Sequence, residues 1–141
     1  MKTPLNFAIV LFISLHLFSC FSESNSIIEY MDKLSEEITQ CTNDKEYDIV
    51  YKKIINLKND ERFNNLRDEN EKKEATMKML LLTQEALAAK AILYVLPQST
   101  TITPDDMKFL LNECISKNLN VMMAPYSEVK KLVYDYCKIS E

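Results

Sequence analysis

Residues 70–96 read "NEKKEATMKMLLLTQEALAAKAILYVL" and carry the longest helical pattern in the chain. Charged side chains open this stretch, it becomes almost wholly apolar from Met79 onward, and Pro97 ends it. One face of the predicted helix is marked by Met77, Leu80, Leu81, Gln84, Ala88, Ala91, Ile92 and Val95. A helix that is apolar on nearly all sides usually lies at the centre of a domain. We therefore expect the other helices to pack around residues 70–96.

Three further segments show the periodicity of amphipathic helices, at about 24–41, 103–119 and 125–137. In the second of these, Thr103 suits the N-cap and Pro104 the first helical position. The expected core positions are Ile27, Ile28, Met31, Leu34 and Ile38, then Met107, Leu110, Leu111, Cys114 and Ile115, and finally Val129, Leu132, Val133 and Tyr136. Four principal helices predict a small all-α bundle.

The polar segment 42–69 separates the first two of these helices. We interpret it as a long crossover connection that contains one short helix. The apolar residues of that short helix are Tyr47, Val50, Tyr51, Ile54 and Ile55.

Residues 1–19 have the pattern of a secretion signal, with Lys2 followed by the apolar run 7–18 and then small residues. No second apolar run of similar length follows, so we expect no membrane insertion. The remaining residues, 20–141, are enough for a single helical domain. The sequence therefore predicts a secreted, extracellular protein.

The composition argues against several classes of function. The chain has no glycine, so it has no glycine-rich phosphate loop, and its only histidine, His16, lies in the signal. The domain therefore lacks the histidine of Ser-His and Cys-His catalysis and of histidine–zinc sites. Without Lys2, 16 basic and 21 acidic residues remain, which gives a net charge of −5. This negative charge does not favour binding to nucleic acid. We expect no enzymatic activity and no cofactor.

Four cysteines stand at positions 20, 41, 114 and 137. Cleavage after Ser19 keeps all four, and three pairings are then open, whereas cleavage after Ser22 removes Cys20. A Cys20–Cys137 bridge would join the two ends of the domain and would leave Cys41 and Cys114 as a second pair. A buried free thiol at Cys114, on an apolar helix face, is the alternative.

The segment "IIEYMDKLSEEITQCTNDKEYDI", residues 27–49, resembles the first helix of the interleukin-4/interleukin-13 family of short-chain helical cytokines. Cys20 falls where that family places the cysteine before this helix. At the other end, "YDYCKIS", residues 134–140, is similar to the family's last turn, with Lys131 and Tyr134 six and three positions before the final cysteine. The matches in the first helix are Ile27, Ile28, Leu34, Glu36, Thr39, Thr42, Asp48 and Ile49.

The resemblance implies a short-chain four-helix bundle with up-up-down-down topology and long crossover connections. It also implies a Cys20–Cys137 disulfide, since the first and last cysteines pair in that family, and leaves Cys41–Cys114 as the second bridge. Its function would be to bridge cell-surface cytokine receptor chains as a monomer in immune signalling. The helix A/D face would use Ile28, Asp32, Lys131 and Tyr134.

The helix A/C face that the family uses for its other receptor chain departs from the pattern. The family's glutamate in the first helix falls on Ser26, so Glu29 or Glu23, about one turn away, is the candidate substitute. Lys108 and Lys117 are the candidates for its basic partner in the third principal helix.

Three other functions fit parts of the sequence. A secreted helical carrier of small hydrophobic ligands, similar to odorant-binding proteins, fits the size and acidity but lacks their Cys-x-x-x-Cys helix. "LFSC", residues 17–20, also fits a bacterial lipobox, which would make the chain a lipid-anchored surface protein. A parasite or venom effector is the third. The methionines that could line a carrier's pocket are Met77, Met79, Met107, Met122 and Met123.

Overall fold

The computed structural model describes residues 26–122 and 126–140, and this part of the chain is all helical. The all-α prediction is confirmed for these residues. The main helices are α2 (Ser26–Gln40), α3 (Asp44–Asn56), α5 (Glu69–Val95), α6 (Pro104–Ser116) and α7 (Ser127–Cys137). Between α3 and α5 lie a 3-10 turn, η1 (Leu57–Asn59), and one short helix, α4 (Glu61–Asn64).

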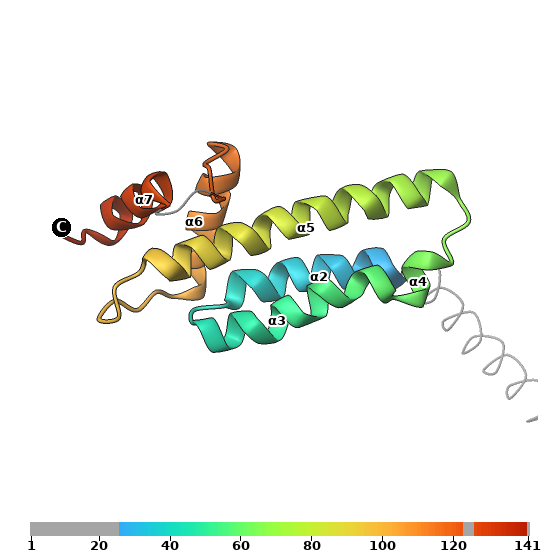
Figure 1. Cartoon of the computed structure of the whole chain (residues 1–141), viewed down its shortest axis with the longest axis horizontal. Helices are drawn as coiled ribbons and strands as arrows, with labels where there is room; N and C mark the ends of the chain where they lie inside the picture. Colours follow the sequence, from blue (N-terminus) through green and yellow to red (C-terminus); the bar gives the residue numbers. More distant parts are fainter. Residues whose placement is uncertain (1–25, 123–125, 141) are drawn as a thin grey trace, which may run out of the picture.

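Helices α2, α3 and α5 lie side by side (Figure 1). Helices α2 and α5 run in the same direction, and α3 runs in the opposite direction beside both. Helix α6 crosses α5 steeply near the end of α5, and α7 packs on α5 and α6 at that same end. The first half of α5 therefore has helical neighbours only on the side of α2 and α3.

The sequence around α5 explains where it begins and ends. The Asp68 carboxylate caps the helix by accepting hydrogen bonds from the backbone N–H groups of Asn70 and Glu71, at 2.9 and 3.0 Å. The helix stops at Val95, two residues before Pro97. Its buried residues are Ala75, Leu82, Ala86, Ala88, Ala89, Ala91, Ile92, Leu93 and Val95.

The predicted buried face of this helix is covered only in its second half. Residues from Ala88 to Val95 on that face are buried, but Met77, Leu80 and Leu81 are 57, 53 and 49% exposed. The expectation of a helix buried all round is thus wrong for its first half. The reason is that α6 crosses α5 instead of running along it (Figure 1).

Helix α3 is a full member of the core and not part of a loose crossover. Asn43 caps it, and Tyr47, Val50 and Ile54 are buried. The Tyr47 hydroxyl donates a hydrogen bond to the Ala86 carbonyl of α5 at 3.0 Å, and burial raises the pKa of Tyr47. The other two apolar residues predicted for this helix, Tyr51 and Ile55, are exposed.

The other helices match most of their predicted core positions. In α2 these are Ile27, Met31, Leu34 and Ile38, whereas Ile28 is only partly buried. In α6 and α7, Met107, Leu110, Leu111, Cys114, Val129 and Val133 are buried and Leu132 is partly buried. Ile115 and Tyr136, predicted as core residues, are exposed. The start predicted for the last helix, at 125, lies outside the described residues.

The chain has no glycine, so residues with a Cβ atom adopt positive φ at three positions in its described part. Asn118, after α6, has φ 47° and is a residue type that tolerates this conformation. Tyr126 and Lys138, which flank α7, both have φ 54°, where a Cβ atom makes the backbone less favourable. Both ends of α7 therefore carry a conformational cost that its packing must offset. None of the helices described for this chain is long and apolar enough to cross a membrane.

Two neighbouring isoleucines test whether α3 belongs to the core. Ile54 is 6% exposed and Ile55 is 46% exposed. We expect Ile54→Ala to lower the free energy of unfolding by about 2–4 kcal/mol, because it leaves a cavity against α5 and α2. Ile55→Ala is the matched control and should change it by less than about 0.5 kcal/mol. Urea titrations followed by circular dichroism measure both, and equal effects would mean that α3 does not pack as described.

Candidate functional site

Aromatic side chains gather along α7 at one end of the molecule. At the start of α7, Tyr126 meets Tyr94 of α5 edge to face, with ring centroids 5.2 Å apart. Near the end of α7, Tyr136 stacks on Phe109 of α6 at 4.7 Å. Tyr134 lies between these contacts in sequence and is partly buried against the core. We call Tyr94, Phe109, Tyr126, Tyr134 and Tyr136 the α7 aromatic surface.

Several of these rings are open to solvent although they are large. Tyr94 is 67% exposed, Phe109 45% and Tyr136 37%. Aromatic side chains of this kind carry a large share of the binding energy in many protein interfaces, because they bury much area with few rotatable bonds. The surface therefore has the composition of a protein contact site.

Lysines accompany this surface. The Lys130 ammonium lies 4.9 Å from the centre of the Tyr134 ring, a cation–π contact. Lys131, next in sequence, is exposed. Glu128 and Asp135 of the same helix balance these two positive charges, so α7 itself carries no net charge.

One carboxylate ties the end of α7 to the start of α6. Asp106 accepts hydrogen bonds from the backbone N–H and the hydroxyl of Thr103, both at 2.8 Å. The first of these and the bond from the Asp106 backbone N–H to the Thr103 hydroxyl oxygen, at 3.2 Å, form the capping box of α6. The other carboxylate oxygen of Asp106 accepts a hydrogen bond from the Tyr136 hydroxyl at 2.8 Å. The bonds from Thr103, and then that from Tyr136, hold the pKa of Asp106 below its ordinary value, and the same bond raises the pKa of Tyr136.

Helix α7 is held to the rest of the protein by few buried groups. Val129 and Val133 are its fully buried side chains, and Glu128 accepts a hydrogen bond from the backbone N–H of Asn120 at 3.1 Å. Leu132, Tyr134 and Cys137 pack against the core as partly buried side chains, and the aromatic contacts and the Asp106–Tyr136 bond add to this attachment.

The predicted receptor-binding residues fall at two separate places. Ile28, Glu29 and Asp32 lie in the first turns of α2, and Asp32 forms an ion pair with Lys78 of α5. Lys131 and Tyr134 lie in α7, at the opposite end of the long axis (Figure 1). The structure therefore does not bring these five residues together into one face.

The residues considered for the helix A/C face are likewise dispersed. Lys117, just after α6, forms an ion pair with Glu113 at 2.7 Å, and Lys108 is exposed on α6. Glu29 is exposed in the first turn of α2, whereas Glu23 lies outside the described residues.

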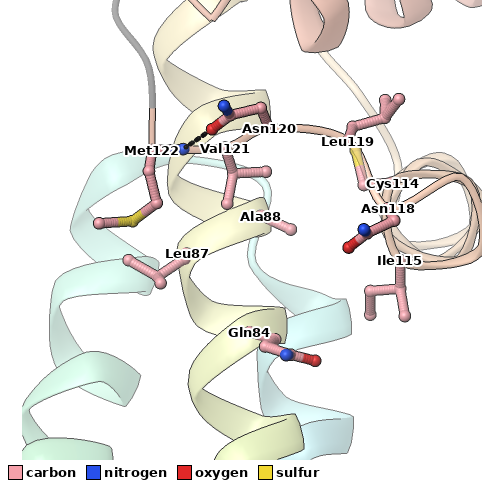
Figure 2. Close-up of a pocket in the computed structure, with 10 residues that line it drawn as sticks. All are labelled: Gln84, Leu87, Ala88, Cys114, Ile115, Asn118, Leu119, Asn120, Val121 and Met122. Atoms are coloured by element: carbon pink, nitrogen blue, oxygen red, sulfur yellow. Dashed lines mark hydrogen bonds between the residues drawn. The ribbon is translucent and has the colours of Figure 1, made fainter.

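An open pocket of about 380 Å³ lies where the end of α6 and the following segment meet α5. Figure 2 shows Leu87 and Met122 at one side of α5, with Cys114 and Leu119 at the other, and Val121 in line with α5 between them. The Met122 backbone N–H donates a hydrogen bond to the Asn120 side-chain oxygen at 3.1 Å, which orders the rim. The other lining residues are Gln84, Ala88, Ile115 and Asn118. This volume suits a small ligand, but polar side chains share the lining and the pocket is open.

Cys41, Cys114 and Cys137 form no disulfide with one another in the described residues. The Cys41–Cys114 disulfide, the pair left over by the terminal bridge, is therefore not present there. Cys41 instead donates a hydrogen bond to the Glu37 carbonyl at 3.3 Å. Burial raises the pKa of Cys41 and of Cys114 to about 11. Cys20 lies outside the described residues, so the Cys20–Cys137 pairing stays a prediction.

Comparisons with models of protein families, with curated proteins and with solved structures give no match for this chain. Within the described residues, no three side chains of the His, Cys, Asp or Glu type gather as metal ligands would.

Sequence reasoning identified Lys131 and Tyr134 but missed Tyr94, Phe109 and Tyr126. Tyr94 lies in the last turn of a helix that is apolar on nearly all sides, where the sequence pattern does not distinguish an exposed tyrosine from a buried one. The position of Phe109, between the core residues Met107 and Leu110, was a signal that it faces outward.

Thiol labelling tests the cysteine assignment. In the native protein without reductant, we expect Cys41 and Cys114 to resist maleimide reagents, because both are buried, and to react once denaturant unfolds the chain. Peptide mass spectrometry reads out each site. A failure of both to react in denaturant until reductant is added would show that they are paired. Cys137 reports separately on the terminal bridge, since it is blocked if paired and reactive if free.

The Asp106 carboxylate gives an acid-dependent contribution to stability. Because its folded pKa is lowered, the stabilisation is present above the ordinary value of 3.8 and is lost as the pH falls through the folded pKa. We expect Asp106→Asn to be less stable than the wild type at pH 6, and the difference to narrow below pH 3.8. Thermal denaturation across this pH range measures it. Asp105→Asn is the neighbouring control, and a difference that stayed constant with pH for Asp106→Asn would contradict the assignment.

Proposed function

We propose that the chain is a secreted signalling protein that binds cell-surface cytokine receptor chains, with the α7 aromatic surface as a contact site. The observation that carries this proposal is the exposure of three aromatic rings around α7, namely those of Tyr94, Phe109 and Tyr136. Lys131 is exposed on α7 as well. The predicted secretion signal and the resemblance of residues 27–49 and 134–140 to the interleukin-4/interleukin-13 family support it from the sequence.

The proposed receptor site differs from the one implied by the resemblance. It keeps Lys131 and Tyr134 of α7 and adds the stacked rings of Phe109 and Tyr136. The residues of α2, namely Ile28, Glu29 and Asp32, would contact a different receptor chain or a different part of the same one. A ligand that bridges two receptor chains needs two separated surfaces, and these two sets lie at opposite ends of the molecule (Figure 1).

The finer topology is part of the same proposal. An up-up-down-down bundle has its first two long helices parallel and joined by a long connection. The parallel arrangement of α2 and α5 supports this reading. The packed helix α3 within the connection and the steep crossing of α6 depart from it, so the proposed receptor site rests on the surface itself and not on the topology.

The receptor proposal is tested by surface plasmon resonance on immobilised ectodomains of the receptor chains used by the interleukin-4/interleukin-13 family. Lys131→Glu reverses an exposed charge and should weaken binding about 10-fold or more. Lys45→Glu, an exposed position on α3, is the matched control and should stay within about twofold. Absence of binding by the wild type, or an equal effect of the control, would contradict the proposal.

The pocket beside α5 and α6 favours a second candidate, the secreted carrier of small hydrophobic ligands. Its volume of about 380 Å³ and the side chains of Leu87, Ile115 and Met122 suit an apolar ligand. The pocket is open to solvent, and Gln84, Asn118 and Asn120 make its rim polar. Both features support the carrier function less strongly than an enclosed apolar cavity would.

A fluorescent fatty-acid analogue distinguishes the carrier from the receptor ligand. If the chain is a carrier, the probe binds with micromolar affinity, unlabelled fatty acid displaces it, and Leu87→Glu abolishes the signal by placing a charge in the pocket. For the receptor ligand we expect no saturable probe binding. Tyr94→Glu, at a ring outside the pocket lining, controls for a general effect of an added charge.

A further inference from the structure

The exposed rings of Phe109 and Tyr136 form a stacked pair where α6 meets the end of α7. Their centroids are 4.7 Å apart, and the angle between their planes is 18°. Each ring covers one face of the other, so the opposite face and the edges of each ring stay open to solvent. The face of an aromatic ring is negative and attracts cations. We call Phe109 and Tyr136 the ring pair.

The Asp106 carboxylate holds the ring pair in position. One of its oxygens accepts the hydrogen bond from the Tyr136 hydroxyl, and the other accepts the two bonds from Thr103. Both oxygens are therefore engaged within the molecule. A ring that is already held in place loses little freedom when a partner binds to it, which favours affinity.

A second carboxylate, that of Asp105, lies beside the ring pair. Asp105 is exposed in the first turn of α6, four residues before Phe109. Helical side chains lean toward the N-terminus of their helix, which brings the Phe109 ring toward Asp105. The hydrogen bond to Asp106 raises the pKa of Tyr136, and the charge of Asp105 adds to this effect, so Asp105 lies near Tyr136 as well. Within the part of the chain that the structure describes, no lysine or arginine pairs with Asp105.

The rest of α6 adds no positive charge on the face that carries Phe109. The positions one turn away from Phe109 on that face are Asp105, Asp106, Asn112 and Glu113. Glu113 forms an ion pair with Lys117. Lys108 is exposed, but it directly precedes Phe109 and is therefore turned about 100° away around the helix.

The lysines of α7 are also turned away from the ring pair. Lys130 and Lys131 lie about 120–140° around the helix from Tyr136, and Lys130 contacts the Tyr134 ring instead. Lys138 is exposed just beyond the end of α7, and the exposed carboxylate of Asp135 precedes Tyr136. The surroundings of the ring pair therefore combine open ring faces with an excess of negative charge.

We propose that the ring pair and Asp105 bind an arginine side chain of a protein partner. The guanidinium group is planar, so it can lie flat on a ring face while its N–H groups donate hydrogen bonds to the Asp105 carboxylate. The compact lysine ammonium carries the same charge but lacks this planar stacking and the paired donors. The inference deepens the proposed function and rests on it in one respect, namely that the receptor chain supplies the arginine.

NMR titration of the secreted protein with the tripeptide acetyl-Gly-Arg-Gly-amide tests the site without any receptor. We expect saturable shifts of the Phe109 and Tyr136 ring signals, with a dissociation constant on the order of 10 mM at low salt. The same tripeptide with citrulline is the uncharged isostere and should bind at least about threefold more weakly, because it offers no cation. The lysine tripeptide should also bind more weakly than the arginine tripeptide.

Two variants assign the response to the proposed groups. Asp105→Asn removes the counter-charge and Phe109→Leu removes a ring face, and each should weaken binding of the arginine tripeptide about two- to fivefold. Both side chains are exposed, so the backbone amide spectrum should keep its native dispersion. Glu36→Gln, an exposed carboxylate of α2, is the matched control and should change binding by less than about 1.5-fold.

Equal binding of the citrulline tripeptide, an equal effect of Glu36→Gln, or the absence of saturable shifts overturns the arginine site. The titration also separates this inference from the receptor proposal. Specific binding of the arginine tripeptide without binding to the receptor ectodomains supports the site and contradicts only the receptor as the source of the arginine. Receptor binding that Asp105→Asn does not weaken, together with no response to the tripeptide, overturns the arginine site alone.

Discussion

The structure depends on the alanine-rich second half of α5, from Ala86 to Val95. Small side chains at these positions let helices from both sides approach the same backbone, and the contact distance of packed helices follows the size of the residues between them. Ala86 lies against α3, where its carbonyl accepts the Tyr47 hydroxyl, and Ala88 lines the pocket shared with α6. Ile92 is fully buried in the same stretch. A larger residue at Ala86 or Ala89 would separate α5 from the helices packed on that side.

The same constraint explains why the surface is uneven. Helices α6 and α7 are short and gather where α5 offers alanines, so the methionine and leucines of its first half remain open. Helix α7 makes few buried contacts. Ring contacts of exposed aromatic side chains and the hydrogen bond from Tyr136 to the Asp106 carboxylate add to them. The exposed rings around α7 and the exposed apolar side chains in the first half of α5 therefore arise from a single packing arrangement.

The sequence predicted the helices well, and their arrangement poorly. Helix bounds followed from local signals such as Thr103 at the N-cap and Pro97, which act within a few residues. The core membership of α3 and the exposure of Met77, Leu80 and Leu81 depend on which helices meet, and periodicity does not encode that. Of the candidate site, Lys131 and Tyr134 were found by resemblance, whereas Phe109 and Tyr94 belong to it only because α7 docks beside them.

Amide hydrogen exchange measured by NMR tests the central claim, that α3 and the second half of α5 form one cooperative core. Residues 47–54 and 86–95 should exchange only through global unfolding, with equal free energies of opening, whereas residues 69–77 should exchange through smaller local openings. Exchange of residues 47–54 at the rates of an unprotected loop, while 86–95 stay protected, would contradict the account.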